Sequence, residues 1–299
     1  MKLVLTLVGP DRQPLAAPLL DEVQALLPDA DAPVALADEA VDIPFTAEPD
    51  WIPSLEENVR KALAGTATDM AVTPADGRRK RLLIADMDST FITVECIDEL
   101  ADFAGVRDAV VSITERAMRG EIDFEGALTE RVGLMKGLPE SALQQAFDER
   151  VRLMPGGRTL VRTMKAGGAH AALVSGGFTF FTERVSGLVG FDEHHANRLM
   201  FADGRLTGKV GQPILGRAAK LEQLNRLCGV LGIATCDALA VGDGANDLAM
   251  IQAAGLGVAY HAKPVTAAAA GARVEHGDLS TLLYYQGIPR VEWVEETEE

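Results

Sequence analysis

The stretch that decides the fold is Arg81-Leu82-Leu83-Ile84-Ala85-Asp86-Met87-Asp88-Ser89-Thr90. Its apolar first half predicts a buried β-strand. Alternate residues of a strand point to the same side, so we expect the Asp86 and Asp88 carboxylates to converge at its carboxyl end, where open α/β sheets bind ligands. Two adjacent carboxylates repel unless a cation or a shared proton separates them. The pair therefore predicts a divalent metal, most simply Mg²⁺, with one aspartate as nucleophile and the other as general acid/base.

Taken alone, an Asp-x-Asp pair is more often part of a turn or a helix cap than of a catalytic site. The rest of the chain must therefore support the functional interpretation. Further apolar segments alternate with helical patterns, which predicts a Rossmann-like α/β fold with a parallel sheet covered on both faces. The predicted strands are Arg81–Asp86, Ala169–Ser175, Ala238–Asp243 and Gly257–Tyr260.

Residues 95–154 have helical spacing throughout and are too long for a loop between a strand and the next helix, so they predict a helical cap inserted into the sheet domain. The helical patterns are Ile97–Ala101, Val106–Ala117, Phe124–Met135 and Glu140–Arg150. Residues 197–210 alternate around Asp203-Gly204, which predicts a β-hairpin. We assign residues 76–290 to the sheet domain and its cap, and residues 291–299 to a solvated acidic tail.

Residues 1–75 predict a separate small α+β domain. Leu3–Val8 is typical of a strand, Pro14–Leu27 and Leu55–Leu63 have helical spacing, and Val34–Ile43 could supply one or two strands. The order is βαβ-like and loosely resembles an ACT-type amino-acid-binding module. The basic run Arg78–Arg81 follows and is interpreted as a solvated linker between the two domains.

Composition excludes several classes of function. The 299 residues are 47% hydrophobic and carry a formal net charge of −16, which argues against nucleic acid or an anionic membrane as a partner. No apolar run reaches the ~18 residues that suggest a transmembrane helix, and the start lacks the features of a signal peptide. Three cysteines without a Cys-x-x-Cys pair predict neither a disulfide framework nor a zinc site. We expect a cytoplasmic protein.

Three more motifs follow in chain order. Ser175-Gly176-Gly177 comes after an apolar strand, where a hydroxyl and backbone N–H groups can approach an anion, although a plain tight turn would read the same way. Lys220 begins a helical pattern, and a solvated lysine is the simpler interpretation of it in isolation. The turn Gly242-Asp243-Gly244-Ala245-Asn246-Asp247 crowds polar side chains after another strand, and metal binding explains this crowding better than a turn does.

Together these motifs resemble the haloacid dehalogenase superfamily, whose members share an Asp-x-Asp-x-Thr segment, a Ser/Thr, a Lys and a Gly-Asp-x-x-Asn-Asp segment in this order. Within it, the chain resembles the phosphoserine phosphatases over about residues 81–285. Glu95 in Phe91-Ile92-Thr93-Val94-Glu95, Arg131 in Arg131-Val132-Gly133-Leu134-Met135, and the hairpin at residues 196–208 carry this closer resemblance.

The resemblance implies hydrolysis of O-phospho-L-serine, the last step of serine biosynthesis, through an aspartyl-phosphate at Asp86, with Asp88 as general acid and base. It implies Mg²⁺ bound by Asp86, the Asp88 carbonyl and Asp243, with Asp247 in support. It implies Glu95 against the substrate ammonium and Arg131 against its carboxylate. The implied phosphate- and substrate-binding residues are Ser175, Gly176, Lys220 and Asn246.

Alternatives remain open at this point. Phe124 and Met118 match pocket-lining positions of the family but could equally be cap core, and Asn246 could simply form a turn. The substrate could be another small phosphorylated metabolite. The ACT-like pattern supports a different class, a regulatory amino-acid-binding protein, and the first domain could also mediate a homodimer.

Overall fold

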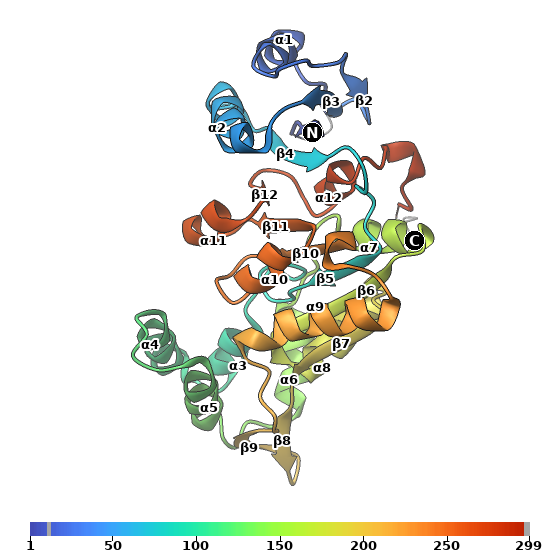
Figure 1. Ribbon diagram of the computed structural model, residues 1–299. Helices are drawn as coiled ribbons and strands as arrows, with labels where there is room; N and C mark the ends of the chain where they lie inside the picture. Colours follow the sequence, from blue (N-terminus) through green and yellow to red (C-terminus); the bar gives the residue numbers. More distant parts are fainter. Residues whose placement is uncertain (11–12, 296–299) are drawn as a thin grey trace.

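The computed structural model describes residues 1–10 and 13–295 and contains three β-sheets (Figure 1). A four-stranded sheet belongs to the N-terminal unit, which we define as residues 2–74. A six-stranded sheet forms the centre of the molecule, and a two-stranded hairpin lies apart from both. In Figure 1 the N-terminal unit is at the top, and the helical insertion and hairpin are at the bottom.

The N-terminal unit has the element order βαββαβ and an antiparallel sheet in the order β2-β3-β1-β4. The expected βαβ-like order was therefore incomplete, because Asp69–Pro74 was not predicted as a strand: the segment is short and ends in a proline. Apolar residues of this sheet and its two helices form a hydrophobic core of their own. The elements are β1 (Lys2–Val8), α1 (Ala17–Ala25), β2 (Val34–Ala35), β3 (Ala40–Thr46), α2 (Ile52–Ala62) and β4 (Asp69–Pro74).

The central sheet is parallel, in the order β12-β11-β10-β5-β6-β7. The four strands predicted from apolar runs are present within one to three residues of their predicted ends. Two edge strands were not predicted: one contains the polar run Glu193-His194-His195, and the other has three residues. The strands are β5 (Leu82–Ala85), β6 (His170–Phe178), β7 (Glu193–Asn197), β10 (Ala238–Gly242), β11 (Leu256–Tyr260) and β12 (Ala272–Val274).

Helices cover both faces of this sheet, which explains why its strands are apolar at consecutive positions. Leu83 and Ala85 of β5 face one core together with Leu160 and Phe181, whereas Leu82 and Ile84 face a second core with Leu224. The parallel α/β architecture predicted from the sequence is confirmed. The helices around the sheet are α7 (Gly157–Ala166), α8 (Thr179–Val189), α9 (Arg217–Leu231), α10 (Leu248–Ala253), α11 (Pro264–Ala269) and α12 (Thr281–Tyr285).

Five helices lie between β5 and β6; the first four form the insertion, as predicted, and α7 packs on the sheet. The hairpin packs on them: Gly137 N donates to the Leu206 carbonyl at 2.8 Å, and Leu206 N donates to the Leu138 carbonyl at 2.8 Å. The hairpin was predicted from residue 197, but Asn197 instead ends β7. The elements are α3 (Cys96–Phe103), α4 (Arg107–Met118), α5 (Phe124–Leu134), α6 (Ser141–Arg150), β8 (Leu199–Ala202) and β9 (Arg205–Val210).

Arg78 joins the N-terminal unit to the central sheet domain. Its guanidinium pairs with Asp42 of β3 and donates to Thr6 Oγ1 of β1 at 2.9 Å and to the Tyr284 carbonyl at 3.2 Å. Asp69 adds a second junction, because its carboxylate accepts the backbone N–H groups of residues 275–277. The interpretation of residues 78–81 as a solvated linker is therefore wrong for Arg78, which is held by a buried carboxylate.

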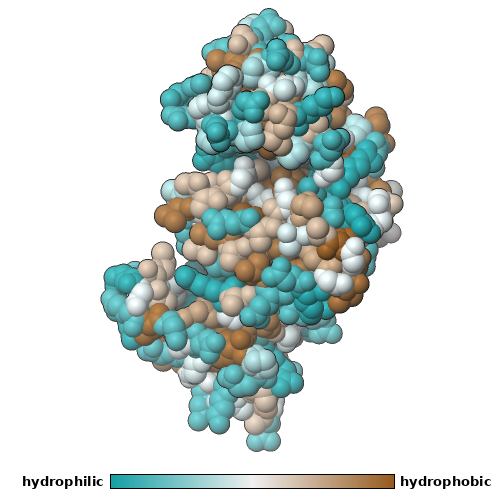
Figure 2. Space-filling model, in the orientation of Figure 1, coloured by the Kyte–Doolittle hydropathy of each residue, from teal (hydrophilic) through white to brown (hydrophobic). Residues whose placement is uncertain are grey.

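The described part of the acidic tail is not fully solvated. Trp293 lies 4.6 Å from Tyr284, ring centroid to centroid, and Val294 N donates to Thr163 Oγ1 at 2.9 Å. The rest of the predicted tail, residues 296–299, lies outside the described residues. Figure 2 shows hydrophilic residues over much of the N-terminal unit and the helical insertion. No helix in residues 1–10 and 13–295 has the length and apolar character needed to cross a membrane.

Candidate active site

The polar residues of the predicted site lie at the carboxyl ends of the three central strands. Asp86 directly follows β5 and Asp243 directly follows β10, while Ser175 lies within β6, three residues before its end. Lys220 lies in the first turn of α9, which covers the same sheet. Parallel strands bring their carboxyl ends to one edge, so the topology gathers residues that are far apart in the sequence.

Asp86, Asp243 and Asp247 form an acidic cluster, in which one carboxylate oxygen from each lies within 4.8 Å of the others. Gly242 allows the turn to fold this tightly, because a Cβ there would lie 2.4 Å from Asp247 Cγ. Burial and the neighbouring Asp247 raise the pKa of Asp86 well above its ordinary value, and the same two causes raise that of Asp243 to about 6. Three hard oxygen donors that repel one another fit a divalent cation such as Mg²⁺.

Lys220 supplies the positive charge at the centre of the cluster. Its ammonium lies 2.7 Å from Asp86 Oδ1 and also pairs with Asp247, and only 3% of the residue is exposed. Burial disfavours the charged form, but Asp247 and Asp86 outweigh burial and raise the pKa of Lys220. The solvated-lysine alternative is therefore wrong. One ammonium among three carboxylates leaves a net negative charge that a bound cation would balance.

Asp88 has different partners from Asp86. Its Oδ1 accepts the Cys96 N–H at 3.0 Å and its Oδ2 accepts the Ser175 hydroxyl at 3.2 Å. Burial, followed by the charge of Glu95, raises the pKa of Asp88 to about 7. Strand β5 ends at Ala85, before the pair, so strand alternation does not position these carboxylates as predicted. The two aspartates are neighbours that differ in hydrogen bonding, which suits two different tasks.

The loop at the end of β6 is fixed by side-chain contacts. Gly177 N donates to Ser175 Oγ at 2.8 Å, and Asn197 Nδ2 donates to the Gly176 carbonyl at 2.9 Å. Gly177 cannot carry a side chain, since a Cβ there would lie 2.6 Å from Asp88 Oδ2. Ser175 therefore connects this loop to Asp88, and the predicted phosphate-binding segment lies beside the predicted general acid.

Glu95 lies at the start of α3 and is exposed. Ser89 Oγ donates to Glu95 Oε1 at 2.7 Å, and the Ser89 backbone adopts a positive φ of 56°. A serine with positive φ is uncommon, and such backbone positions occur often at functional sites. The turn after Asp88 therefore places the Ser89 hydroxyl against the Glu95 carboxylate, which was predicted to bind the substrate ammonium group.

Arg131 lies on α5 of the insertion and is half-buried. Its Nε donates to the Ala127 carbonyl at 3.2 Å and its Nη1 to Thr114 Oγ1 at 3.4 Å. No carboxylate of the described chain forms an ion pair with it. Burial lowers its pKa, against the opposing charges of Asp98 and Glu95. Its guanidinium thus remains available for an anion that enters the space between insertion and sheet.

Phe124 and Met118, the two further residues matched to pocket positions, differ in their surroundings. Phe124 lies at the start of α5 against Gly176 of β6, since a Cβ on Gly176 would lie 3.1 Å from its ring. Met118 is 69% exposed at the end of α4, which rules out cap core for this residue. Asn246 is half-buried, and its amide oxygen lies 2.3 Å from where a Cβ on Gly244 would be. Phe124 therefore closes one side of the candidate site.

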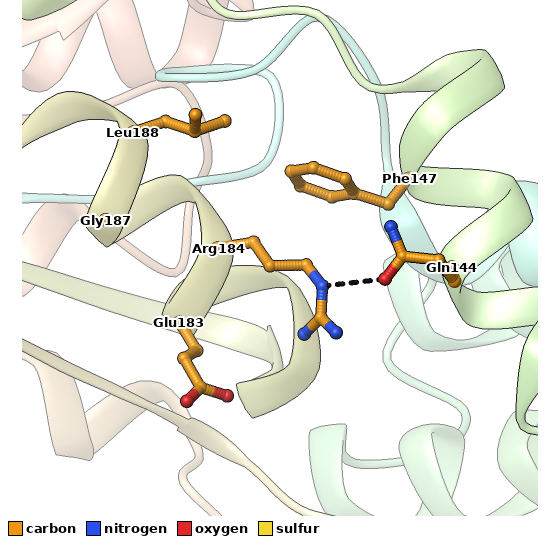
Figure 3. Close-up of a pocket in the computed structure, with 6 residues that line it drawn as sticks. All are labelled: Gln144, Phe147, Glu183, Arg184, Gly187 and Leu188. Atoms are coloured by element: carbon orange, nitrogen blue, oxygen red, sulfur yellow. Dashed lines mark hydrogen bonds between the residues drawn. The ribbon is translucent and has the colours of Figure 1, made fainter.

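A surface hollow of about 520 Å³ lies elsewhere, between α6 of the insertion and α8 (Figure 3). Arg184 Nε donates to Gln144 Oε1 at 3.1 Å across it. Its lining residues are Gln144, Phe147, Glu183, Arg184, Gly187 and Leu188, none of which belongs to the predicted site. The hollow therefore lies where the insertion meets the sheet domain.

Sequence reasoning missed two residues that contact the site. Ser89 was quoted as part of the first motif without a role, and Asn197 was placed in the hairpin. The positive φ of Ser89 could not be predicted, because nothing in the sequence marks a serine that adopts this conformation. The strand that Asn197 ends has four polar residues among five and no apolar alternation, so the pattern could not place the amide beside Gly176.

Comparison with known proteins agrees with this geometry. Residues 83–252 match the family model described as haloacid dehalogenase-like hydrolase. A phosphoserine phosphatase from Albidiferax ferrireducens is 47% identical over 208 residues, which cover 68% of this chain and 88% of that protein. One from Streptomyces coelicolor is 45% identical over 256 residues, which cover 83% of this chain but only 62% of that longer protein.

A solved structure agrees over nearly the whole chain, including the N-terminal unit. A HAD family hydrolase from Salmonella enterica serovar Typhi superposes with a TM-score of 0.81 at 30% sequence identity, covering 95% of this chain and 98% of that one. The family match spans the acidic cluster, the loop after β6 and Lys220. The chain therefore belongs to the haloacid dehalogenase-like hydrolases.

Proposed function

We propose that this protein hydrolyses O-phospho-L-serine to L-serine and phosphate. The observation that carries the proposal is the arrangement of Asp86 against Lys220, beside an Asp88 that is bonded separately and has a pKa near 7. The two relatives described above, from Albidiferax ferrireducens and Streptomyces coelicolor, are named phosphoserine phosphatases. The proposal places the protein at the last step of serine biosynthesis in the cytoplasm.

Magnesium is the proposed cofactor. Asp86 and Asp243 would hold it with their carboxylates, together with the Asp88 backbone carbonyl, and Asp247 would support the site. When bound, Mg²⁺ neutralises charge on the phosphoryl oxygens and aligns them for transfer. Lys220 adds a fixed positive charge next to the same oxygens. The two cations together would offset the repulsion that a phosphate meets in a chain with a net charge of −16.

The first chemical step is transfer to the enzyme. The Asp86 carboxylate attacks phosphorus, and a bond forms between its oxygen and phosphorus as the bond to the serine oxygen breaks. Asp88 gives its proton to the departing serine oxygen, so no free alkoxide is released. The Ser175 hydroxyl, the Gly176 N–H, Asn246 and Lys220 are proposed to hold the phosphoryl oxygens during transfer.

The second step returns the enzyme to its starting state. Asp88, now ionised, takes a proton from water as the water oxygen attacks phosphorus. The bond between phosphorus and Asp86 breaks, phosphate leaves, and Asp88 is protonated again. A group that alternately gives and accepts a proton works best with a pKa near the operating pH, which agrees with the value of about 7 for Asp88.

Recognition of the amino-acid part is assigned to two residues of opposite charge. Glu95 would pair with the substrate ammonium, in a position set by its bond to Ser89. Arg131 would form a bidentate pair with the substrate carboxylate. Because Arg131 belongs to the insertion and Glu95 to the segment that begins it, substrate would draw the insertion toward the sheet and exclude water.

Phosphate release from L-phosphoserine with Mg²⁺, with and without EDTA, tests this proposal, and an aryl phosphate serves as the second substrate. We expect rapid turnover of phosphoserine that EDTA abolishes. If only the aryl phosphate is hydrolysed, the protein is a phosphatase, but phosphoserine is rejected as its substrate in favour of another phosphorylated metabolite. Failure of both substrates would reject the catalytic proposal.

A second function is proposed for the N-terminal unit, as a module that binds an amino acid or forms a homodimer. Its βαββαβ topology and separate core support this assignment, which would coexist with catalysis. Calorimetry of the full chain with L-serine, combined with light scattering, is the test. If calorimetry detects no second serine-binding site and light scattering detects no dimer, the function proposed for the N-terminal unit is rejected.

A further inference from the structure

We propose that Asn197 is a positioning residue that fixes the two phosphate-binding segments of the site relative to each other. The residue lies at the end of β7 and is 1% exposed, so its amide is almost completely removed from water. A buried amide without partners is costly, and this one has partners for both its nitrogen and its oxygen. Those partners belong to the last residues of β6 and to the segment before α9.

The first set of contacts reaches the segment that carries Lys220. Asn197 Oδ1 accepts the Leu215 N–H at 2.8 Å, and Asn197 Nδ2 donates to the Leu215 carbonyl at 3.3 Å. Gly216 follows and caps α9, so Lys220 lies five residues beyond the bonded peptide. A rigid helix begins immediately after this contact, and its first turn delivers the Lys220 ammonium to Asp86.

The second contact reaches the irregular last part of β6, between Val174 and Phe178. Asn197 Nδ2 donates to the Gly176 carbonyl at 2.9 Å, and the N–H of the same peptide, on Gly177, donates to Ser175 Oγ at 2.8 Å. Both ends of one peptide group are therefore hydrogen-bonded. Strand pairing is irregular here and glycine restricts the backbone little, so these two bonds help to fix the orientation of this peptide.

The contacts form a continuous chain across the site. Leu215 bonds to Asn197, Asn197 to the peptide between Gly176 and Gly177, this peptide to Ser175, and Ser175 to Asp88 Oδ2 at 3.2 Å. Asn197 is the member that joins strand β6 to the start of α9, which are brought together only by tertiary structure. Loss of its amide would leave each segment folded but free to shift against the other.

The chemistry of the amide makes the role specific. The donors face two carbonyl oxygens and the acceptor faces an N–H group, so the side chain needs both kinds of group at once. Asn197→Asp keeps the size and the bond from Leu215 N–H, but it places an oxygen against the Gly176 carbonyl. Asn197→Ala removes all three bonds. Asn197→Ala thus tests the loss of the hydrogen bonds, and Asn197→Asp tests the replacement of a donor by an acceptor that faces the Gly176 carbonyl.

The experiment measures KM and kcat with an aryl phosphate and the inhibition constant of inorganic phosphate, each with saturating Mg²⁺. Thr182→Val is the matched control, because Thr182 is also fully buried and bonds to His194 of β7 but not to either phosphate-binding segment. KM and the inhibition constant describe the active molecules, so a lower folded fraction does not change them, whereas kcat is calculated per folded molecule. Circular dichroism and urea unfolding give the folded fraction of every variant.

We expect Asn197→Ala to raise KM and the phosphate inhibition constant together by about tenfold, the equivalent of one or two lost hydrogen bonds. Asn197→Asp should raise both further, and Thr182→Val should change neither. An unchanged KM and an unchanged inhibition constant, with a reduced folded fraction, would overturn the proposal in favour of a purely structural role. Absence of folded protein for both Asn197 variants would overturn it as well.

The inference rests on phosphate binding at this site and not on the amino-acid substrate. If the wild-type protein hydrolyses the aryl phosphate but not phosphoserine, the proposed substrate fails while the role of Asn197 is still measured. If the wild type hydrolyses neither compound, phosphate binding by calorimetry decides: a weaker affinity in the Asn197 variants supports the role, and an unchanged affinity rejects it.

Discussion

Individual side chains in the site differ in task because they differ in partners. Asp86 lies against an ammonium and two carboxylates, whereas Asp88 accepts one backbone N–H and one hydroxyl. Burial raises the pKa of both aspartates, but the charges beside them differ: Asp247 and Lys220 act on Asp86, and Glu95 acts on Asp88. Lys220 fixes the position of the Asp86 carboxylate, whereas Asp88 is held by a backbone N–H and a hydroxyl, neither of which carries a net charge.

Removing the nucleophile should abolish turnover. We expect Asp86→Asn to lower phosphate release by about a thousandfold or more, since the amide cannot form the proposed aspartyl-phosphate. A colorimetric phosphate assay measures the change. Asp50→Asn, an exposed aspartate of the N-terminal unit, is the control. Activity within tenfold of the wild type would show that another group attacks phosphorus.

The acidic cluster should also make stability depend on pH in the absence of metal. Burial and Asp247 raise the pKa of Asp243 to about 6, whereas the unfolded chain has an ordinary value near 3.9. The folded state then binds this proton more tightly than the unfolded state. Its contribution to stability is fully present below about pH 4 and is lost as the pH rises through 6.

Asp243→Asn should therefore stabilise the metal-free protein at neutral and higher pH. We expect its free energy of unfolding in EDTA at pH 8 to exceed that of the wild type by about 2 kcal/mol, because a buried like charge is removed. The gain should vanish near pH 4. Urea unfolding at the two pH values measures it, and equal effects at both would contradict a protonation origin.

At the scale of elements, the sequence predicted those that have a clear period or an apolar run. The central strands β5, β6, β10 and β11 and the helices of the insertion lie where expected. Short or polar elements were missed: β4 ends in a proline, β7 begins Glu193-His194-His195, and β12 has three residues. These edge strands form because neighbouring strands offer hydrogen bonds, which is information from the tertiary structure.

Helix α5 of the insertion should determine which substrates bind well. We expect Arg131→Ala to raise KM for phosphoserine by about thirtyfold, since a bidentate charged contact contributes about 2 kcal/mol. Arg131→Lys should recover little, because an ammonium cannot make the paired contact. Steady-state kinetics with an aryl phosphate, which lacks the carboxylate, provides the control and should change little. Equal losses on both substrates would show that Arg131 acts on phosphate or on folding.

At the scale of the whole molecule, the N-terminal unit and the helical insertion lie at opposite ends of the central sheet (Figure 1). The motifs predicted the positions of the site residues, but the bonds between them depend on the tertiary fold. Arg78 illustrates the same point. A run of four basic residues is typical of a solvated surface, yet its first member is held by Asp42, a residue of a distant strand.

The Arg78 junction should contribute to stability without affecting catalysis. We expect Arg78→Ala to lower the free energy of unfolding by about 3 kcal/mol, because Asp42 would be left buried without its partner. Arg79→Ala is the matched control: its pair with Glu292 is exposed, and its loss should cost less than about 1 kcal/mol. Urea unfolding compares them, and kcat of the folded fraction should stay at the wild-type value. A similar loss for both variants would show that the buried pair has no special role.

The place of β5 in the middle of its sheet has a consequence for the newly made chain. The strand pairs with β6 on one side and with β10 on the other, where Leu82 lies opposite Ala238. A ribosome that has released Asp86 and Asp88 must still synthesise the insertion, the hairpin and α9 before β10 emerges. The N-terminal unit can meanwhile complete its own sheet. The proposed activity should therefore appear abruptly and late during synthesis, because Asp243 and Asp247 of the proposed metal site arrive only after β10 has left the ribosome.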